Sequence, residues 1–201
     1  GCLVPDADAS VHGFDGPLKV STLRSPSGFN QLMLDAAVEC GHARNDDFNG
    51  AQQDGVGLYH VTQERGVRSD AAHAYLDPVR ARANLVLMPN AHAMRITFDD
   101  LRASGVEIAE GGSKRHLAAR REVIVSAGAF GSPQLLQLSG VGPGADLQRL
   151  GLSCIADRAQ VGANLQDHHD AILTRRVQDV RLFGLSLAGL RTIWGAWGQY
   201  K

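Results

Sequence analysis

The chain has 201 residues, of which 44% are hydrophobic and 20% are charged, and its formal net charge at pH 7 is −1. This composition is typical of a globular protein with one or two domains and a hydrophobic core. A nearly balanced charge argues against a function that depends on electrostatic attraction to nucleic acid or to an anionic membrane. No apolar run approaches the roughly 20 residues of a membrane helix, so stable membrane insertion is not expected.

The cysteine content indicates the redox environment. The three cysteines are far apart in the sequence and form no CxxC pair: Cys2, Cys40 and Cys154. An odd number at wide spacing argues against a disulfide framework and against a zinc ribbon, and it favours a reducing, cytoplasmic compartment. The N-terminal residues have neither the basic region nor the apolar stretch of a signal peptide, and no initiator Met. We therefore expect a processed product or a fragment.

The first 80 residues predict short elements joined by loops. Apolar residues recur at helical spacing after Pro26, and Gly41 is a natural stop for that helix. Residues 44–57 are polar and rich in glycine, which indicates a loop. The elements expected in this part are a strand at Leu18–Thr22, a helix from about Pro26 to Cys40, a strand at Leu58–Gln63 and a helix at Ser69–Leu76.

From Asn84 onward the apolar residues alternate with a period of two, which predicts a β-meander. The strands expected are Leu85–Met88, Met94–Phe98, Gly105–Ala109, His116–Ala119 and Glu122–Ser126, followed by helices at Ser132–Leu138 and Asp146–Leu150. This mixture of helices and strands predicts an α/β fold class. Near the C-terminus the spacing of Leu187, Leu190, Trp194 and Trp197 predicts an amphipathic helix that packs on a core rather than a membrane anchor.

Glu122–Gly142 predicts a strand, a turn of small residues and a helix. Val123–Val125 is a continuous apolar run, typical of a strand that is buried on both faces. The small residues of Ala127–Gly131 let a ligand approach the backbone. Ser132 and Pro133 then form a favourable helix start, where free N–H groups favour an anion such as a pyrophosphate. The same pattern also fits α/β proteins that bind no nucleotide, so this segment alone leaves the ligand open.

Several blocks of the sequence resemble the glucose–methanol–choline oxidoreductase family. The longest is Gly128–Gly142, GAFGSPQLLQLSGVG, which is similar to the second signature of that family. Val161–His168, VGANLQDH, resembles its later glycine-rich stretch. Shorter blocks follow the order of the family at Asp15–Leu18, Asn45–Gly50, Ala72–Leu76 and Asn84-Leu85. The resemblance covers most of the chain, from about residue 12 to about residue 170.

The resemblance implies an FAD-dependent oxidoreductase that acts on the CH–OH group of an alcohol and transfers a hydride to the flavin. The substrate would be choline or another primary alcohol, and an electron acceptor would be the second partner. The fold implied is an incomplete Rossmann-like FAD-binding domain with a β-meander, plus parts of a substrate-binding domain. Residues 1–78 would be substrate-side and connecting segments, residues 79–160 part of the FAD-binding domain, and residues 161–201 the start of the substrate-binding domain.

The resemblance also implies which residues lie near the cofactor. A residue at the position of Ala93 contacts the adenine through its backbone in the family, and an Ala there keeps this contact possible. Ser126, Ala127 and Gly128 would lie beside the adenosine half of FAD. At the start of the second predicted helix, Asp70 stands where the family usually has a small hydroxyl residue.

The family features that carry the chemistry do not occur in this chain. It contains no GxGxxG unit for the FAD pyrophosphate. The catalytic His of the family lies nearer the C-terminus of the whole enzyme, so no residue here is assigned as the catalytic base. We therefore expect this fragment alone to be inactive. Two alternatives stay open, namely a truncated remnant that catalyses nothing and a lyase of the same family.

Two polar clusters are weighed as metal sites. Asp167–Asp170 contains two adjacent His residues, which diverge on either a strand or a helix and do not match a spaced ligand set. Asn45–Gly50 lacks the alternating carboxylates and the final Glu of a calcium loop. No metal site is therefore predicted. The second segment is either a structured loop near the substrate entrance or a plain surface loop, and His60, His73 and His92 have no partner nearby in the sequence.

Overall fold

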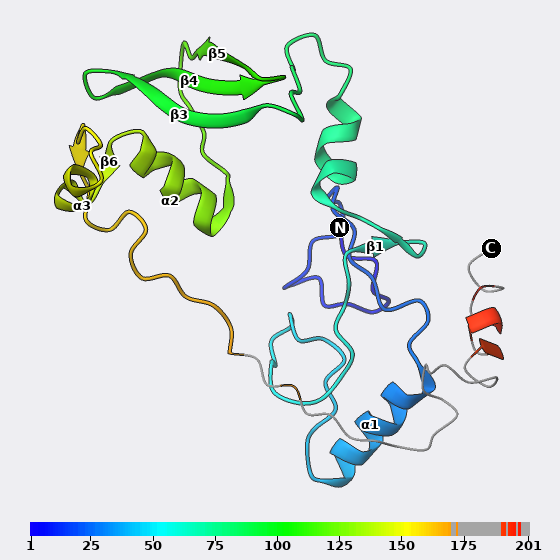
Figure 1. Ribbon diagram of the computed structural model, residues 1–201. Coiled ribbons are helices and arrows are strands. Elements are labelled where there is room, and N and C mark those ends of the chain that lie inside the picture. Colours follow the sequence, from blue (N-terminus) through cyan, green and yellow to red (C-terminus); the bar gives the residue numbers. More distant parts are fainter. Residues whose placement is uncertain (170–171, 173–189, 192, 196, 198–201) are drawn as a thin grey trace. The chain divides into compact units, whose positions relative to one another are not determined.

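The computed structural model describes residues 1–169, 172, 190–191, 193–195 and 197 (Figure 1). The chain divides into two compact units, and the site residues expected from the sequence all lie in the second. Unit 1 comprises Gly1–Leu85 and Thr174–Lys201, and unit 2 comprises Val86–Leu173.

Unit 1 contains the helix α1, Gly28–Glu39, which confirms the helix expected between Pro26 and Cys40. It follows Ser27 and ends before Gly41, whose φ of +94° is readily adopted by glycine. The strands expected at Leu18–Thr22 and Leu58–Gln63 are wrong. These segments form single bridges instead, between Cys2 and Val20 and between Ser21 and Val61, because each meets its partner at one residue only.

A two-residue hairpin and two short helical turns complete unit 1. β1, Gln63–Glu64, pairs antiparallel with β2, Val67–Arg68. Arg65 and Gly66 between them have φ values of +51° and +81°, as a type I′ turn requires. The π-helix η1, Ala72–Leu76, and the 3₁₀ helix η2, Asp77–Val79, follow where one helix at Ser69–Leu76 was expected.

Asp70 replaces the usual hydroxyl residue at the start of η1 and forms the kind of hydrogen bond that a cap forms. Its Oδ1 accepts a hydrogen bond from the backbone N–H of His73 at 2.9 Å and lies 2.9 Å from the His73 Nδ1. These hydrogen bonds hold the pKa of Asp70 below its usual value, and the bond that the His73 ring forms to the Asp70 carboxylate raises the pKa of His73. The departure from the family pattern is therefore compatible with a helical turn at this point.

A three-stranded antiparallel sheet forms the framework of unit 2 and confirms the predicted meander. β3, His92–Asp99, pairs with β4, Arg102–Glu110, and β4 pairs with β5, Ser113–Ala118. Ile96 and Ile108, each 5% exposed, lie on its inner face. The additional strand expected at Leu85–Met88 is wrong, because these residues have no strand partner in the described part of the chain.

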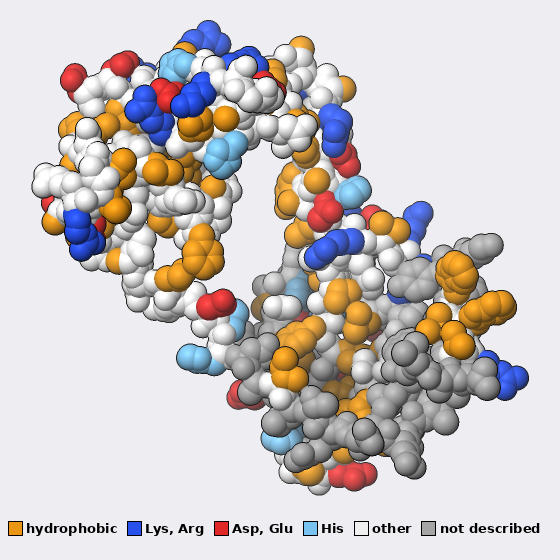
Figure 2. Space-filling view, in the orientation of Figure 1, with side chains coloured by type: hydrophobic (Ala, Val, Ile, Leu, Met, Phe, Trp, Pro, Cys, Tyr) orange, Lys and Arg blue, Asp and Glu red, His pale blue; other side chains and the backbone are white. Residues whose placement is uncertain are grey.

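The outer face of this sheet carries charged side chains of both signs. Figure 2 shows Lys and Arg side chains next to Asp and Glu side chains there. The Arg95 guanidinium donates two hydrogen bonds to the Glu107 carboxylate, at 2.8 and 2.7 Å. The hydrogen bond from Arg95 is also the main cause that lowers the pKa of Glu107. Such exposed pairs contribute little to stability, so the buried inner face determines how the sheet packs.

The helix α2, Gly128–Leu138, packs against β3. It begins four residues before the expected start at Ser132, so Pro133 lies inside the helix. The Ser132 hydroxyl does not cap the helix from outside. It lies in the first turns and accepts a hydrogen bond from the backbone N–H of Ala127 at 3.0 Å. The expected start was wrong because Gly128, with a φ of +82°, lets the chain turn directly into the helix.

After α2 the chain forms a small parallel unit. β6, Val141–Gly142, pairs with β7, Ala156–Asp157, and α3, Gly144–Arg149, connects them. Leu147 of α3 is 1% exposed and is the most deeply buried hydrophobic residue described. The Asp157 Oδ1 accepts a hydrogen bond from the Gly144 N–H at 2.9 Å, which satisfies a donor at the start of α3.

The strand expected at Glu122–Ser126 does not form. These residues have no assigned strand, and no described strand pairs with them. Ile124, which was expected to be buried on both faces of a sheet, is 78% exposed. A strand of this kind needs neighbouring strands on both sides, and the sequence pattern cannot supply them.

The aromatic stripe near the C-terminus is described only in part. Leu190, Trp194 and Trp197 have helical conformation and are exposed, whereas Leu187 lies outside the described residues. Among the helices that the structure describes, none has the length and apolar character to cross a membrane.

We predict that Ser139→Ala destabilises unit 2. The Ser139 hydroxyl accepts the hydrogen bond of the Ile96 N–H at 2.8 Å, and Ser139 is 5% exposed, so the substitution leaves a buried donor without an acceptor. The free energy of unfolding should fall by about 1–3 kcal/mol in urea titrations followed by circular dichroism. Ser153→Ala is the matched control, since Ser153 is exposed and the change should stay within about 0.5 kcal/mol. Equal effects of the two substitutions would contradict the prediction.

We also predict that Gly105→Ala disrupts the meander. A Cβ at Gly105 would lie 2.5 Å from the Leu117 carbonyl oxygen and 2.6 Å from the His116 Nε2, closer than real contacts allow. We expect the free energy of unfolding to fall by about 1–3 kcal/mol. Gly13→Ala, where the added methyl group meets open space, serves as the control. A Gly105→Ala variant as stable as this control would show that the strand can shift without cost.

Candidate functional site

The turn at Ser126–Gly128 is a solvent-exposed part of the predicted site. All three of its residues, Ser126, Ala127 and Gly128, are exposed and lead directly into α2. Gly128 has a φ of +82°, and nothing lies within 4 Å of the place where its Cβ would be. Another molecule can therefore approach the backbone at Gly128 without meeting a side chain.

The first turn of α2 offers hydrogen-bond donors around this opening. The Ala127 N–H is already donated to the Ser132 hydroxyl. The N–H groups at the start of an α-helix have no partner within the helix and favour polar or anionic groups. Ala129 and Gly131 keep this turn small, whereas Phe130 is 75% exposed. Figure 2 shows hydrophobic side chains at the surface around the start of α2, so an adenosine group would find both polar and apolar surface here.

Ala93 lies near the start of β3, in the same unit as the turn. It is exposed and pairs with Ile108 of β4. The register shifts between Ala93 and Arg95, which leaves a β-bulge at Met94. Bulges interrupt the regular ladder and are frequent next to binding sites. In Figure 1, β3 and α2 run in the same general direction, so the start of each element lies toward the same end of the unit.

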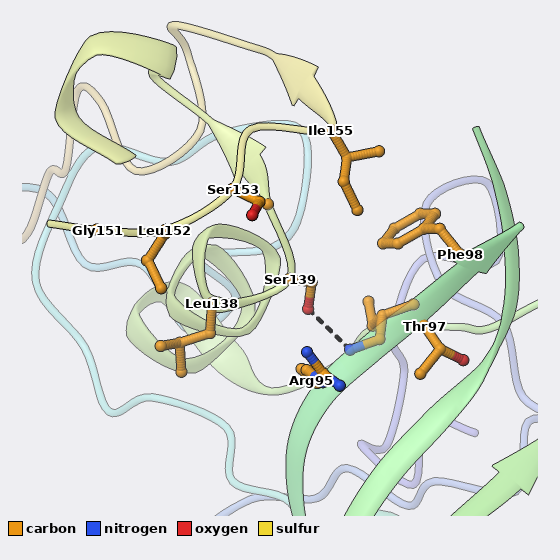
Figure 3. A pocket seen from close by; sticks show the side chains of 11 residues that line it. Arg95, Thr97, Phe98, Leu138, Ser139, Gly151, Leu152, Ser153 and Ile155 are labelled. Atoms are coloured by element: carbon orange, nitrogen blue, oxygen red, sulfur yellow. Dashed lines mark hydrogen bonds between the residues drawn. The ribbon is translucent and has the colours of Figure 1, made fainter. Parts of the chain in front are cut away.

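A cavity of about 430 Å³ lies elsewhere in unit 2 (Figure 3). It is bounded by β3, by the end of α2 and by residues 151–155, and Figure 3 shows the hydrogen bond between Ser139 and the backbone of Ile96 within it. None of the four predicted cofactor residues belongs to the lining. The turn, in contrast, combines exposed backbone with the N–H groups of the first turn of α2 at the positions expected from the sequence.

The VGANLQDH block is attached to α2. The Gln137 side-chain amide donates a hydrogen bond to the Val161 carbonyl at 2.9 Å. Gly162 has a φ of +83°, which glycine readily adopts, and a Cβ there would lie 2.8 Å from the Gln137 Nε2 and disturb this contact. Asn164 adopts a φ of +55° just beyond it. Two of the blocks that carry the family resemblance are therefore in direct contact.

The sequence predictions missed a cluster in unit 1. The His12 Nε2 lies 2.6 Å from the Asp47 Oδ2, and the His60 Nδ1 lies 3.8 Å from the Asp47 Oδ1. The sequence showed no partner close to His60, and Asp47 was interpreted only as part of a loop. No local pattern could have predicted the pair, because His12 and Asp47 are 35 residues apart in the sequence.

Within the described ranges, no three His, Cys, Asp or Glu side chains are placed to hold a metal ion. In the Asp167–Asp170 segment, the Asp167 carboxylate accepts a hydrogen bond from the His168 backbone N–H at 2.8 Å. Asp170 lies outside the described residues.

Comparison with known proteins places these features in a family. The model of the GMC oxidoreductase family matches residues 4–170. An oxygen-dependent choline dehydrogenase from Burkholderia ambifaria is 48% identical over 161 residues, which is 78% of this chain and 28% of that protein. A second one, from Burkholderia thailandensis, is 47% identical over the same length. The chain thus spans less than a third of the length of these relatives.

Solved structures give the same result. Pyridoxine 4-oxidase from Mesorbium loti aligns with a TM-score of 0.71 and 27% identity, over 78% of this chain and 31% of that one. An FAD-dependent oxidoreductase from Chaetomium thermophilum aligns with a TM-score of 0.70 and 29% identity, over 75% and 26%. These likenesses confirm the predicted mixture of helices and strands as part of a Rossmann-like fold. A family match over most of the chain, together with these relatives, shows that the chain belongs to the GMC oxidoreductase family.

Proposed function

We propose that this chain is part of an FAD-dependent oxidoreductase that acts on the CH–OH group of an alcohol. The observation that carries the proposal is the family match over residues 4–170, with an exposed small-residue turn at the start of α2 inside it. The relatives at 47–48% identity are named oxygen-dependent choline dehydrogenases, which favours choline or another primary alcohol as the substrate. An electron acceptor would be the second partner.

In this proposal, four residues bind the adenosine half of FAD. Ala93 contacts the adenine through its backbone, next to the bulge at Met94. Ser126, Ala127 and Gly128 would lie beside the adenosine. The exposed backbone there and the N–H groups in the first turn of α2 can donate hydrogen bonds to a polar group. A bound FAD would supply the hydride acceptor for oxidation of the alcohol carbon. The described residues of this chain hold and orient the cofactor, and we assign the proton-accepting base to none of them.

The proposed roles of the three parts of the chain follow the domains expected from the sequence. Residues 79–160 would form part of the FAD-binding domain, residues 1–78 the substrate-side and connecting segments, and residues 161–201 the start of the substrate-binding domain. The alternatives are a remnant that no longer catalyses and a lyase that uses the same cofactor without net oxidation. We also propose a cytoplasmic location, because Cys2, Cys40 and Cys154 are all free thiols.

We predict that the purified chain binds FAD weakly but does not oxidise alcohols by itself, because the chain has no GxGxxG unit for the pyrophosphate. FAD titration followed by flavin fluorescence measures binding, and oxygen consumption with choline measures turnover. The longer protein that contains this chain should show a flavin spectrum and alcohol oxidation. Absence of both in that protein would contradict the proposed function, whereas turnover by the chain alone would contradict the remnant alternative.

We predict that Gly128→Ala weakens FAD binding by about tenfold, because a side chain at this position intrudes on the exposed backbone. Gly151→Ala is a matched control, since Gly151 also has a positive φ, +73°, and open space around its missing Cβ. The two substitutions should cost similar stability, about 1 kcal/mol, through backbone strain. Equal FAD affinities for both variants would argue against cofactor binding at this turn.

A further inference from the structure

One carboxylate in unit 1 connects three segments that are far apart in the sequence. Asp47 lies 2.6 Å from the His12 Nε2 and 3.8 Å from the His60 Nδ1. The side chains of His12, Asp47 and His60 are 13%, 27% and 5% exposed. Because an ionised carboxylate only accepts hydrogen bonds, His12 must donate its Nε2–H to Asp47. Charge-assisted bonds of this kind are stronger than neutral ones.

The loop that carries Asp47 is organised by its own side chains. Asn45, 8% exposed, donates hydrogen bonds to the carbonyls of Gln52 and Asp54 at 2.8 and 3.2 Å and accepts one from the Asp47 N–H at 2.8 Å. The Asp47 Oδ1 accepts a hydrogen bond from the Asn49 N–H at 3.0 Å. Internal hydrogen bonds therefore fix the conformation of residues 45–54, the Asn45 loop. The Asp47 carboxylate connects this loop to His12.

The Asn45 loop borders a half-enclosed cavity of about 340 Å³ through Asn49. His12, His60 and Cys2 line the rest, together with glycines and the apolar side chains of Leu18 and Val20. Cys2 is a free thiol and is 9% exposed. Asn49 of the Asn45 loop and Cys2 therefore border the same cavity.

We propose that Asp47, held by His12 and His60, is a latch that keeps the Asn45 loop closed over the cavity containing Cys2, and that the latch opens when the Asp47 carboxylate is neutralised. The loop has no other hydrogen bond between a side chain and the segment at residues 1–21 in the part of the chain that the structure describes. A β-bridge between Arg44 and Val56 joins the two ends of the loop independently of the latch. Opening of the latch would therefore be a local movement of the loop.

The charges around Asp47 determine the pH dependence of the latch. The hydrogen bond from His12 is the main cause that lowers the pKa of Asp47, and the Asn49 N–H and the charges of His12 and His60 act in the same direction, whereas burial opposes them. Asp8 is the other carboxylate near His12, and its pKa is also lowered, mainly by hydrogen bonds from Ser10. A lowered pKa means that the closed state is favoured above the ordinary titration range of Asp and is lost as the pH falls through the lowered value.

The test measures the rate at which Cys2 reacts with 2,2′-dithiodipyridine in a chain that also carries Cys40→Ser and Cys154→Ser. At pH 7 we expect Asp47→Asn to react about tenfold faster than the parent, because the latch opens more often. Asp46→Asn is the matched control. The Asp46 carboxylate is adjacent in the sequence but pairs with Arg44 on the surface, so this substitution should leave the rate unchanged. His12→Phe, which keeps a ring but removes the donor, should act like Asp47→Asn.

The pH dependence is followed as the ratio of the Cys2 reaction rate in Asp47→Asn to the rate in the parent. Both proteins carry the same thiol, so the effect of pH on the ionisation of that thiol cancels in the ratio. The ratio should be large at pH 7 and fall toward one only when the pH drops below the ordinary titration range of Asp, where the Asp47 carboxylate of the parent becomes protonated. Circular dichroism confirms that each variant is folded. Equal Cys2 rates at pH 7 in the parent, Asp47→Asn and His12→Phe, or a ratio that does not change with pH, would overturn the proposal. The outcome does not depend on FAD binding, so it is separate from the proposed function.

Discussion

The hydrogen bond from the Ile96 N–H to the Ser139 hydroxyl is the constraint on which unit 2 depends. It joins the open edge of β3 to the end of α2, and it is buried. The Ser139 hydroxyl also donates to the Leu135 carbonyl, so the helix end is held on both sides. Once the end of α2 is attached to the sheet, the direction of the helix determines where its start lies. The turn at Ser126–Gly128 therefore owes its position to a contact at the opposite end of the helix.

The candidate cofactor site is built from backbone rather than from functional side chains. Ala93, Ala127 and Gly128 offer no acid, base or nucleophile, and their small size exposes peptide groups instead. Such a surface can bind and orient a cofactor, but it cannot move a proton. The proteins that resemble this chain include choline dehydrogenases and a pyridoxine 4-oxidase, whose names give different substrates.

Local patterns predicted the parts of the fold that depend on local periodicity. The meander of β3–β5 and α1 followed from apolar spacing, and the family followed from the Gly128–Gly142 block. Pairing between distant segments was not predictable. The run at Val123–Val125 has the composition of a buried strand, but composition does not specify a partner. The start of α2 was missed because a positive φ at Gly128 cannot be distinguished in sequence from any other glycine. The contact between His12 and Asp47 left no signal, because the two residues lie on separate loops.

The extended run at residues 122–126 has a thermodynamic consequence. Its residues form no backbone hydrogen bond with another described residue, and Ile124 is largely exposed, so this stretch is held only by the packing of the half-buried Val123 and Val125. It leads directly into the turn where we place the adenosine. A ligand or a neighbouring strand that binds only the folded arrangement stabilises it in proportion to the logarithm of its concentration. If the turn binds the cofactor as proposed, the melting temperature of unit 2 would rise with its occupancy, and thermal stability would measure binding even in a chain without catalytic activity.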